Sequence, residues 1–130
     1  MNVVDSSGWL EYLDGGKNAD FFAPAIHDSD HLIVPTICIY EVFKRVLTQR
    51  SEQDALRAVG VMSSGTVIDL DRQLAMNAAQ ISLESKLAMA DSMILATAQA
   101  HKATLWTQDE HFNGLAGVKH IKKEKPVDTP

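Results

Sequence analysis

The chain has 130 residues, of which 45% are hydrophobic and 22% charged, and this composition is typical of one globular domain. A single cysteine excludes an intramolecular disulfide, and the lack of any apolar run approaching about 18 residues argues against a transmembrane helix. The chain opens without a recognisable secretion signal, so we expect a cytoplasmic protein with a net charge of −5.

The first half of the chain alternates short apolar runs with segments of helical periodicity. Ser6 or Ser7 can cap the first helix, Thr36 the third and Ser51 the fourth, while Gly15 is suited to stop the first. In chain order we expect a strand at 1–5, helices at 7–16 and 18–27, a strand at 31–35, and helices at 36–49 and 52–64.

The second half continues this alternation, with Asp71 as a good helix cap. In chain order we expect a strand at 66–70, helices at 72–86 and 90–101, a strand at 103–107, a helical turn at 109–115 and a strand at 117–121. Strands that alternate with helices imply an α/β fold whose parallel sheet, of about five strands, is joined by crossover connections. We expect one domain over residues 1–124 and a frayed tail at 125–130.

Four acidic residues stand where a predicted strand ends or just inside the helix that follows it: Asp5, Glu41, Asp91 and Asp109. A parallel sheet gathers the carboxyl ends of its strands along one edge, and ligands of open α/β folds bind in the crevice outside that edge. Carboxylates that meet there repel one another unless protons or cations neutralise them. The pattern therefore predicts a site for hard divalent cations, which take oxygen ligands.

Each acid also has a structural explanation. Asp5 can cap the helix that follows it, Asp91 can cap or lie in the first turn of its helix, and Asp109 can cap a helical turn. Glu41 is harder to explain in this way because it interrupts an apolar stretch, where an unpaired carboxylate is costly to bury. The shared position of all four at one predicted edge favours a common site.

The phrases that hold these acids resemble those of PIN-domain ribonucleases, and among them the VapC-type toxins of toxin–antitoxin pairs. The matching phrases are VDSSGWLEYL, VPTICIYEVFKRV, LAMADSMILATAQAHKATLWTQDEHF and GVKHI, which together cover nearly the whole chain. The third is the most specific, because an Asp, an Ala-rich helix, a short strand and then Thr-x-Asp form a hallmark of the family. The resemblance implies a three-layer α/β/α fold.

Carried over residue by residue, Asp5, Glu41, Asp91 and Asp109 match the family's acidic quartet. Thr107 matches a Ser or Thr that supports the site, whereas His111 stands where many members carry Asp, at a position peripheral to the quartet.

The resemblance implies a Mg²⁺- or Mn²⁺-dependent endoribonuclease that hydrolyses RNA phosphodiester bonds. Two divalent ions about 4 Å apart can activate a water, neutralise the phosphate and stabilise the leaving oxygen. We expect Asp5, Glu41 and Asp91 to be the principal ligands, Asp109 to complete a second metal site, and Thr107 to hydrogen-bond a ligand or water.

The resemblance also implies partners, namely a cognate antitoxin whose extended segment covers the active-site groove and a second copy of the chain in a homodimer. Support for the homodimer from the residues is indirect and comes from apolar side chains that exceed the expected needs of the core. These are Trp9, Tyr12, Phe21, Phe22 and Tyr40.

The net charge of −5 seems unsuited to a nucleic-acid enzyme, but without the quartet the chain has 12 basic and 13 acidic residues. Lys44 and Arg45 follow Glu41 on one predicted helix, and these cations suit either phosphate contacts or an ordinary solvated surface. Further lysines load the C-terminal end, at Lys119, Lys122, Lys123 and Lys125.

Three other features carry weaker signals. The string HDSDH at 27–31 resembles a metal cluster, but it precedes a strand at the edge opposite the crevice, so we expect a solvated loop. Cys38 lies in an apolar run and is expected to be a buried, inert thiol. His101 and His111 lack the spacing of transition-metal ligands on one helix.

Two alternative functions stay open. A receiver domain of a phosphorelay is also a parallel α/β fold with acids at strand ends, but here Ser6 and Ser7 follow the first acid and Glu41 sits inside a helix. A PIN scaffold that only binds a partner is the second alternative, and the intact quartet argues against it.

Overall fold

The computed structural model describes residues 1–124, and the tail predicted at 125–130 lies outside the described residues, together with Lys125. The described part of the chain forms a parallel sheet of five strands in the order β3-β2-β1-β4-β5. The strands are β1 (Asn2–Val4), β2 (Leu32–Pro35), β3 (Thr66–Ile68), β4 (Thr104–Thr107) and β5 (Val118–His120). The predicted parallel sheet is confirmed, with strands slightly shorter than the apolar runs.

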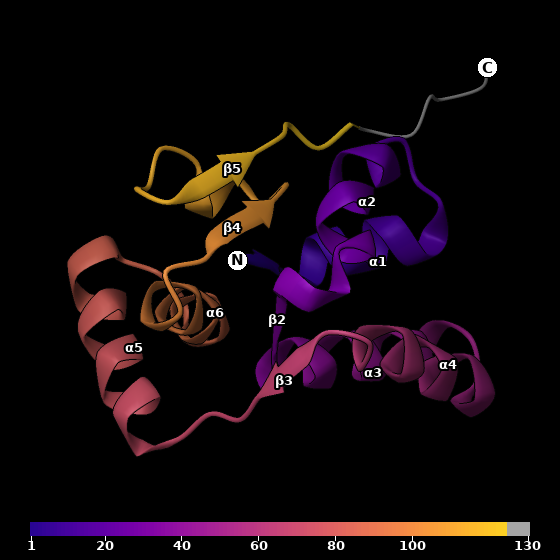
Figure 1. The fold of residues 1–130 in the computed structure, drawn as a ribbon, viewed down its shortest axis with the longest axis horizontal. Coiled ribbons are helices and arrows are strands. Elements are labelled where there is room, and N and C mark those ends of the chain that lie inside the picture. The colour runs from indigo at the N-terminus through magenta and orange to yellow at the C-terminus, as the bar shows by residue number, and fades with distance from the viewer. Residues whose placement is uncertain (125–130) are drawn as a thin grey trace.

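Helices cover both faces of the sheet (Figure 1), which confirms the predicted three-layer α/β/α fold. One layer holds α1 (Ser6–Asp14), α2 (Ala19–His27), α3 (Thr36–Gln49) and α4 (Glu52–Met62), and the other holds α5 (Arg72–Ser85) and α6 (Met89–Ala100). Single helical turns occur at η1 (Ser29–His31) and η2 (Glu110–Phe112). The chain moves across the sheet in one direction from β1 through β2 to β3, and then in the opposite direction to β4 and β5. Because crossovers between parallel strands are right-handed, helices that connect strands in opposite directions lie on opposite faces of the sheet.

The core lies between the sheet and the two helical layers. Val3, Val4 and Leu105 on the central strands are fully buried, as expected for parallel strands covered on both faces. Trp9 and Phe22 are also fully buried, so the expectation that they exceed the needs of the core was wrong. Apolar side chains were counted without knowing which helix face meets the sheet, and only packing decides that.

The start of α1 packs tightly against its neighbours at Gly8. A Cβ atom at this position would lie 2.6 Å from the Phe22 ring and 2.7 Å from Val4, distances that side chains do not tolerate. The glycine therefore lets α1 approach both β1 and α2 closely. Gly15 ends α1 in the left-handed conformation with φ of 65°, as the sequence predicts.

The predicted caps Ser6 or Ser7 on α1 and Thr36 on α3 were wrong, whereas the other predicted caps are confirmed. Asp5, rather than Ser6 or Ser7, accepts the capping hydrogen bond of α1 from the Gly8 amide. Helix α3 begins after Pro35 without a side-chain cap, and the Thr36 hydroxyl instead accepts a 3.3 Å hydrogen bond from the Leu70 amide. The confirmed caps are Asp5 on α1, Ser51 on α4, Asp71 on α5 and Asp109 on the helical turn η2.

None of the helices within residues 1–124 combines the length and the apolar character needed to cross a lipid bilayer.

Candidate active site

The four acids of the sequence analysis line one hollow at the carboxyl edge of the sheet. The order of the strands reverses between the neighbours β1 and β4, and such a switch point opens a crevice in α/β folds. Asp5 follows β1, and Asp109 lies just beyond β4; Glu41 comes from the second turn of α3 and Asp91 from the first turn of α6. The hollow has a volume of about 260 Å³, and its lining residues are Asp5, Ser6, Ser7, Leu10, Glu41, Arg45, Asp91, Ile94 and Asp109.

Asp5 is the most enclosed of these acids, with 2% of its surface exposed. Its carboxylate accepts hydrogen bonds from the Thr107 hydroxyl at 2.6 Å, the Ser7 hydroxyl at 2.8 Å and the Gly8 amide at 2.8 Å. Burial raises the pKa of Asp5 to about 6, the three donors oppose this rise, and the charge of Asp109 adds to it. Asp5 therefore caps α1 and also presents a carboxylate with a raised pKa to the hollow.

Thr107 links two of the acids. The parallel register of β1 and β4 pairs Val4 with Trp106, so the residues that follow each of these also lie side by side. The buried Thr107 hydroxyl donates to Asp5 and accepts a 2.9 Å hydrogen bond from the Asp109 amide. The threonine thus holds the Asp5 side chain and the backbone of the next acid in one arrangement.

Glu41 is held by Ser6, whose hydroxyl donates to its carboxylate at 2.7 Å across 35 positions of sequence. Ser7 donates to Asp5 from the next position along the chain. Each of these serine hydroxyls therefore binds a carboxylate of the hollow and does not cap α1.

Asp91 lies near Asp109 and Glu41, and their negative charges affect its pKa. Burial raises its pKa to about 6, and repulsion from Asp109 and from Glu41 contributes to the rise. His111 opposes it. Because the negative charges of three residues act on one another here, a cation in the hollow would relieve their repulsion.

His111 is the site residue that the sequence analysis missed. It was placed at the periphery, yet its Nδ1 atom lies 3.1 Å from Asp109 Oδ1 and 3.8 Å from Asp91 Oδ2. Ligand atoms of these three residues fall within 4.8 Å of one another, which is close enough for one metal ion. Its spacing of two residues from Asp109, within a predicted helical turn, was the available signal.

Asp5 and Glu41 do not belong to that close group, and their carboxylates accept hydrogen bonds from the hydroxyls of Thr107, Ser7 and Ser6. The structure thus brings all five predicted site residues to the acidic hollow or its wall. It does not bring the four carboxylates close enough together to share one metal ion. Their roles as metal ligands stay a prediction.

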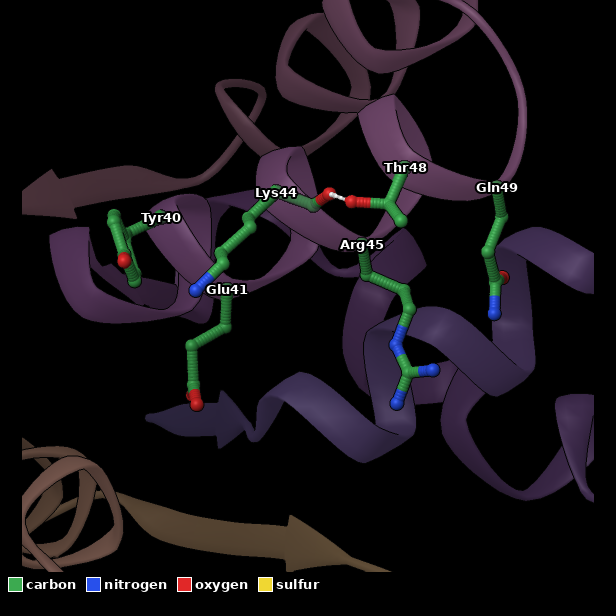
Figure 2. A pocket seen from close by; sticks show the side chains of 6 residues that line it. All are labelled: Tyr40, Glu41, Lys44, Arg45, Thr48 and Gln49. Carbon is green, nitrogen blue, oxygen red and sulfur yellow. Dashed lines mark hydrogen bonds between the residues drawn. The ribbon is translucent and has the colours of Figure 1, made fainter.

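Two cations of α3, Lys44 and Arg45, lie near Glu41 on the same helix (Figure 2). Glu41 and Arg45 line both the acidic hollow and a second hollow of about 300 Å³ on the surface of α3. The second hollow is also bordered by Lys44, whose Nζ atom lies 5.6 Å from the centre of the Tyr40 ring. The second hollow contains one carboxylate and two cationic side chains, and it shares Glu41 and Arg45 with the acidic hollow.

The string at 27–31 lies away from this site, at the start of β2. His31 pairs with Asp28 at 2.9 Å, and His27 shares a 2.9 Å hydrogen bond with Tyr12, all at the surface. Within residues 1–124, the close group around His111 is the one set of three potential ligands that fits an ion. Cys38 is fully buried, and burial raises the pKa of its thiol, which agrees with the prediction of an inert residue.

Comparison with known proteins identifies the architecture. The sequence model of the PIN domain matches residues 3–118. A toxin–antitoxin complex from Klebsiella pneumoniae contains a chain with 25% identity and a TM-score of 0.78, covering 92% of this chain and 96% of that one. None of the curated proteins matches the sequence.

Two further solved structures share the fold at lower identity. Mycobacterium tuberculosis VapC20, described as a toxin that cleaves the sarcin–ricin loop, has a TM-score of 0.74 and 14% identity, covering 92% of this chain and 99% of that chain. A chain of the DNA-bound VapBC from Salmonella typhimurium has a TM-score of 0.70 and 18% identity, covering 94% and 98%.

Proposed function

The chain belongs to the PIN-domain family, and from that premise we propose that it is a divalent-metal-dependent endoribonuclease, the toxin of a toxin–antitoxin pair. The observation that carries the proposal is the convergence of Asp5, Glu41, Asp91 and Asp109 on one hollow at the switch point of the sheet. The likeness to a chain of a Klebsiella toxin–antitoxin complex supports the assignment.

The oxygen atoms available as ligands in this hollow fit a hard divalent cation. All four acids offer carboxylate oxygens, the ligands that Mg²⁺ and Mn²⁺ prefer. Burial raises the pKa of Asp5 and of Asp91 to about 6, and the charge of neighbouring carboxylates adds to the rise. When bound by these acids, divalent ions supply charge neutralisation of the phosphate and a more acidic attacking water.

The chain's own residues prepare the site before any substrate arrives. Thr107 and Ser7 fix Asp5 through hydroxyl donors, and Ser6 fixes Glu41 in the same way. These bonds limit the rotamers of the carboxylates, so fewer side-chain motions must be frozen when a cation binds.

Arg45 is placed to bind the substrate. It lines the same hollow as the four acids, and guanidinium groups bind phosphate oxygens with paired hydrogen bonds. Lys44 and the exposed Tyr40 line the second hollow together with Arg45. A positive charge and an aromatic ring at this place suit the binding of a single RNA strand. We therefore propose unpaired RNA as the substrate, with its backbone running past Arg45.

We further propose two protein partners. An antitoxin is supported by the complexes in which the structural relatives were solved. A homodimer is supported by apolar side chains that stay exposed in this single chain, with Tyr40 the exposed member of the set named from the sequence.

The family match removes the receiver domain as an alternative, since residues 3–118 fit a PIN domain. A non-catalytic PIN scaffold is the remaining competitor. Metal-dependent cleavage separates it from the proposed enzyme.

The test is cleavage of total cellular RNA by the purified protein with Mg²⁺, with Mn²⁺ and with excess EDTA, followed by mapping of the new RNA ends. We expect discrete ends with either metal and none in EDTA. The matched control is the variant with Asp5, Glu41, Asp91 and Asp109 all changed to Asn or Gln, purified in parallel to reveal any contaminating nuclease. Cleavage that persists in EDTA contradicts the proposal, and so does cleavage by the parent that does not exceed that of this variant.

A further inference from the structure

His111 adds a different kind of ligand atom to an acidic site. We propose that its Nδ1 atom is a metal ligand together with Asp91 and Asp109, and that this nitrogen makes the site favour Mn²⁺ over Mg²⁺. The inference rests on the proposed function because it concerns the same metal site. It identifies Mn²⁺ as the preferred ion, whereas the four carboxylates alone do not distinguish Mn²⁺ from Mg²⁺.

The distances suit a shared ion. When two ligand atoms each lie about 2.1 Å from a cation and at right angles, they are about 3.0 Å apart. His111 Nδ1 lies 3.1 Å from Asp109 Oδ1, which matches such a pair, and 3.8 Å from Asp91 Oδ2, which needs only a small rotation of either side chain. The His111 side chain is 76% exposed, so it can turn without disturbing the core.

Local structure holds the imidazole near the acids. Asp109 caps the helical turn η2 by accepting a 2.9 Å hydrogen bond from the His111 amide. Asp91 comes from the first turn of α6, a separate element. The three potential ligands therefore come from two separate elements, and the exposed imidazole can adjust toward the two acids.

The same distances also suit a protonated imidazole paired with two carboxylates. The two explanations differ in chemistry, because a proton holds the group together in one and a metal ion in the other. Only the metal explanation predicts nitrogen coordination, so a direct probe of the metal's ligands distinguishes them.

The nature of the ligand sets the preference between ions. Mg²⁺ takes oxygen ligands in a strict octahedron, whereas the affinity of nitrogen sites for divalent ions of the first transition row rises from Mn²⁺ onward. Exchange of one oxygen for an imidazole nitrogen therefore costs Mg²⁺ more than Mn²⁺. Replacement of His111 by Asp restores an oxygen and is expected to reverse the effect.

The test uses the full chain loaded with Mn²⁺ and reads metal binding rather than cleavage. Pulsed paramagnetic resonance detects ¹⁴N coupling to bound Mn²⁺, and calorimetry with MnCl₂ and MgCl₂ gives the two affinities. The proteins compared are the parent, His111→Ala, His111→Asp and the control His31→Ala. His31 also pairs with an Asp at the surface, so its loss matches the change in charge.

We expect nitrogen coupling in the parent and in His31→Ala, and none in His111→Ala. Because even residues that only support a ligand change affinity by about 10–100-fold, His111→Ala should weaken Mn²⁺ binding at least about tenfold and Mg²⁺ binding less. His111→Asp should bring the two affinities closer together.

Bound Mn²⁺ without nitrogen coupling overturns this inference and leaves the proposed nuclease intact. Equal Mn²⁺ affinity of the parent and His111→Ala overturns it as well. A parent protein that binds neither ion overturns both proposals at once.

Discussion

Two regions of this molecule are rich in Asp and His, and they behave in opposite ways. The string at 27–31 has four such residues in five positions, yet in the structure they are exposed, with His31 paired to Asp28 and His27 bonded to Tyr12. The acidic hollow draws on residues spread from Asp5 to His111, and their side chains meet. Density along the chain is therefore a poor guide to a metal site, and position relative to the ends of parallel strands is a better one.

The two regions also differ in their environment. Asp5 is 2% exposed and three donors bind it, so its charge interacts with its neighbours through little water. Asp28 and His31 form a 2.9 Å pair whose side chains are more than half exposed, and water screens such a pair. The predictions below test whether metal binding and catalysis follow this difference.

The largest expected effect is the loss of activity in Asp91→Asn, matched with Asp30→Asn in the surface string. Loss of a ligand carboxylate should lower RNA cleavage at least about a hundredfold, because loss of groups that only support ligands already costs about 10–100-fold. Asp30→Asn should cleave at the parent rate. Parent-like cleavage by Asp91→Asn, or unfolding of the metal-free variant, would contradict a catalytic role for Asp91.

Thr107→Val should lower cleavage about 10–100-fold, because Asp5 loses its 2.6 Å donor and the Asp109 amide loses its acceptor. The buried carboxylate left short of a partner should also cost about 1–3 kcal/mol of the free energy of unfolding, measured by urea denaturation. Thr107→Ser keeps the hydroxyl, so it should retain most of the cleavage rate and most of the free energy of unfolding. A serine variant as impaired as the valine variant would show that the methyl group matters instead.

The variant with Lys44 and Arg45 both changed to Gln should bind RNA about tenfold more weakly. The logarithm of its affinity should also depend less on the logarithm of salt concentration, by about 0.7 for each lost phosphate contact with a single strand. Fluorescence anisotropy with a labelled RNA in the Asp91→Asn background measures both. The control is Arg57→Gln, which removes an exposed cation from α4. An unchanged salt slope would move the RNA path to the C-terminal lysines.

Added Mg²⁺ or Mn²⁺ should raise the melting temperature of the parent by a few degrees, because a ligand of the native state stabilises it by mass action. The variant that lacks all four acids of the quartet should show a much smaller shift. A second variant, in which His27, Asp28, Asp30 and His31 are replaced by Ala, should keep the full shift. The reverse result would place the metal in the surface string.

The smallest expected effect concerns pH in the absence of metal. The folded-state pKa of Asp91 is raised to about 6 from 3.8, so the folded protein binds more protons than the unfolded chain between these values. The stability contributed by this group is therefore present at low pH and is lost as pH rises through about 6. In EDTA, the gain in melting temperature of Asp91→Asn over the parent should grow from about pH 4 to about pH 6.5 and then level off. If the gain in melting temperature shrinks over this range, the neighbours of Asp91 stabilise its charged form, which contradicts the prediction.

The order and type of the elements could be predicted from the sequence, because they depend on local patterns. The alternation of apolar runs with helical segments predicted the parallel sheet, and Gly15, Ser51 and Asp71 acted as the predicted end signals. The position of the acids at strand ends was also visible, because strand ends are local features. These signals act over a few residues, where the chain's own geometry decides the outcome.

The tertiary structure alone decided which side chains meet. Ser6 binds Glu41 across 35 positions, and Thr107 binds Asp5 across 102, so neither bond has any local signature. The approach of His111 to Asp91 joins the turn η2 to α6, two elements whose relative position depends on the packing of the whole fold. The sequence by itself determined the elements and the acids at their ends, whereas packing and strand order determined the bonds that orient those acids, because contacts between distant segments exist only once the sheet is assembled.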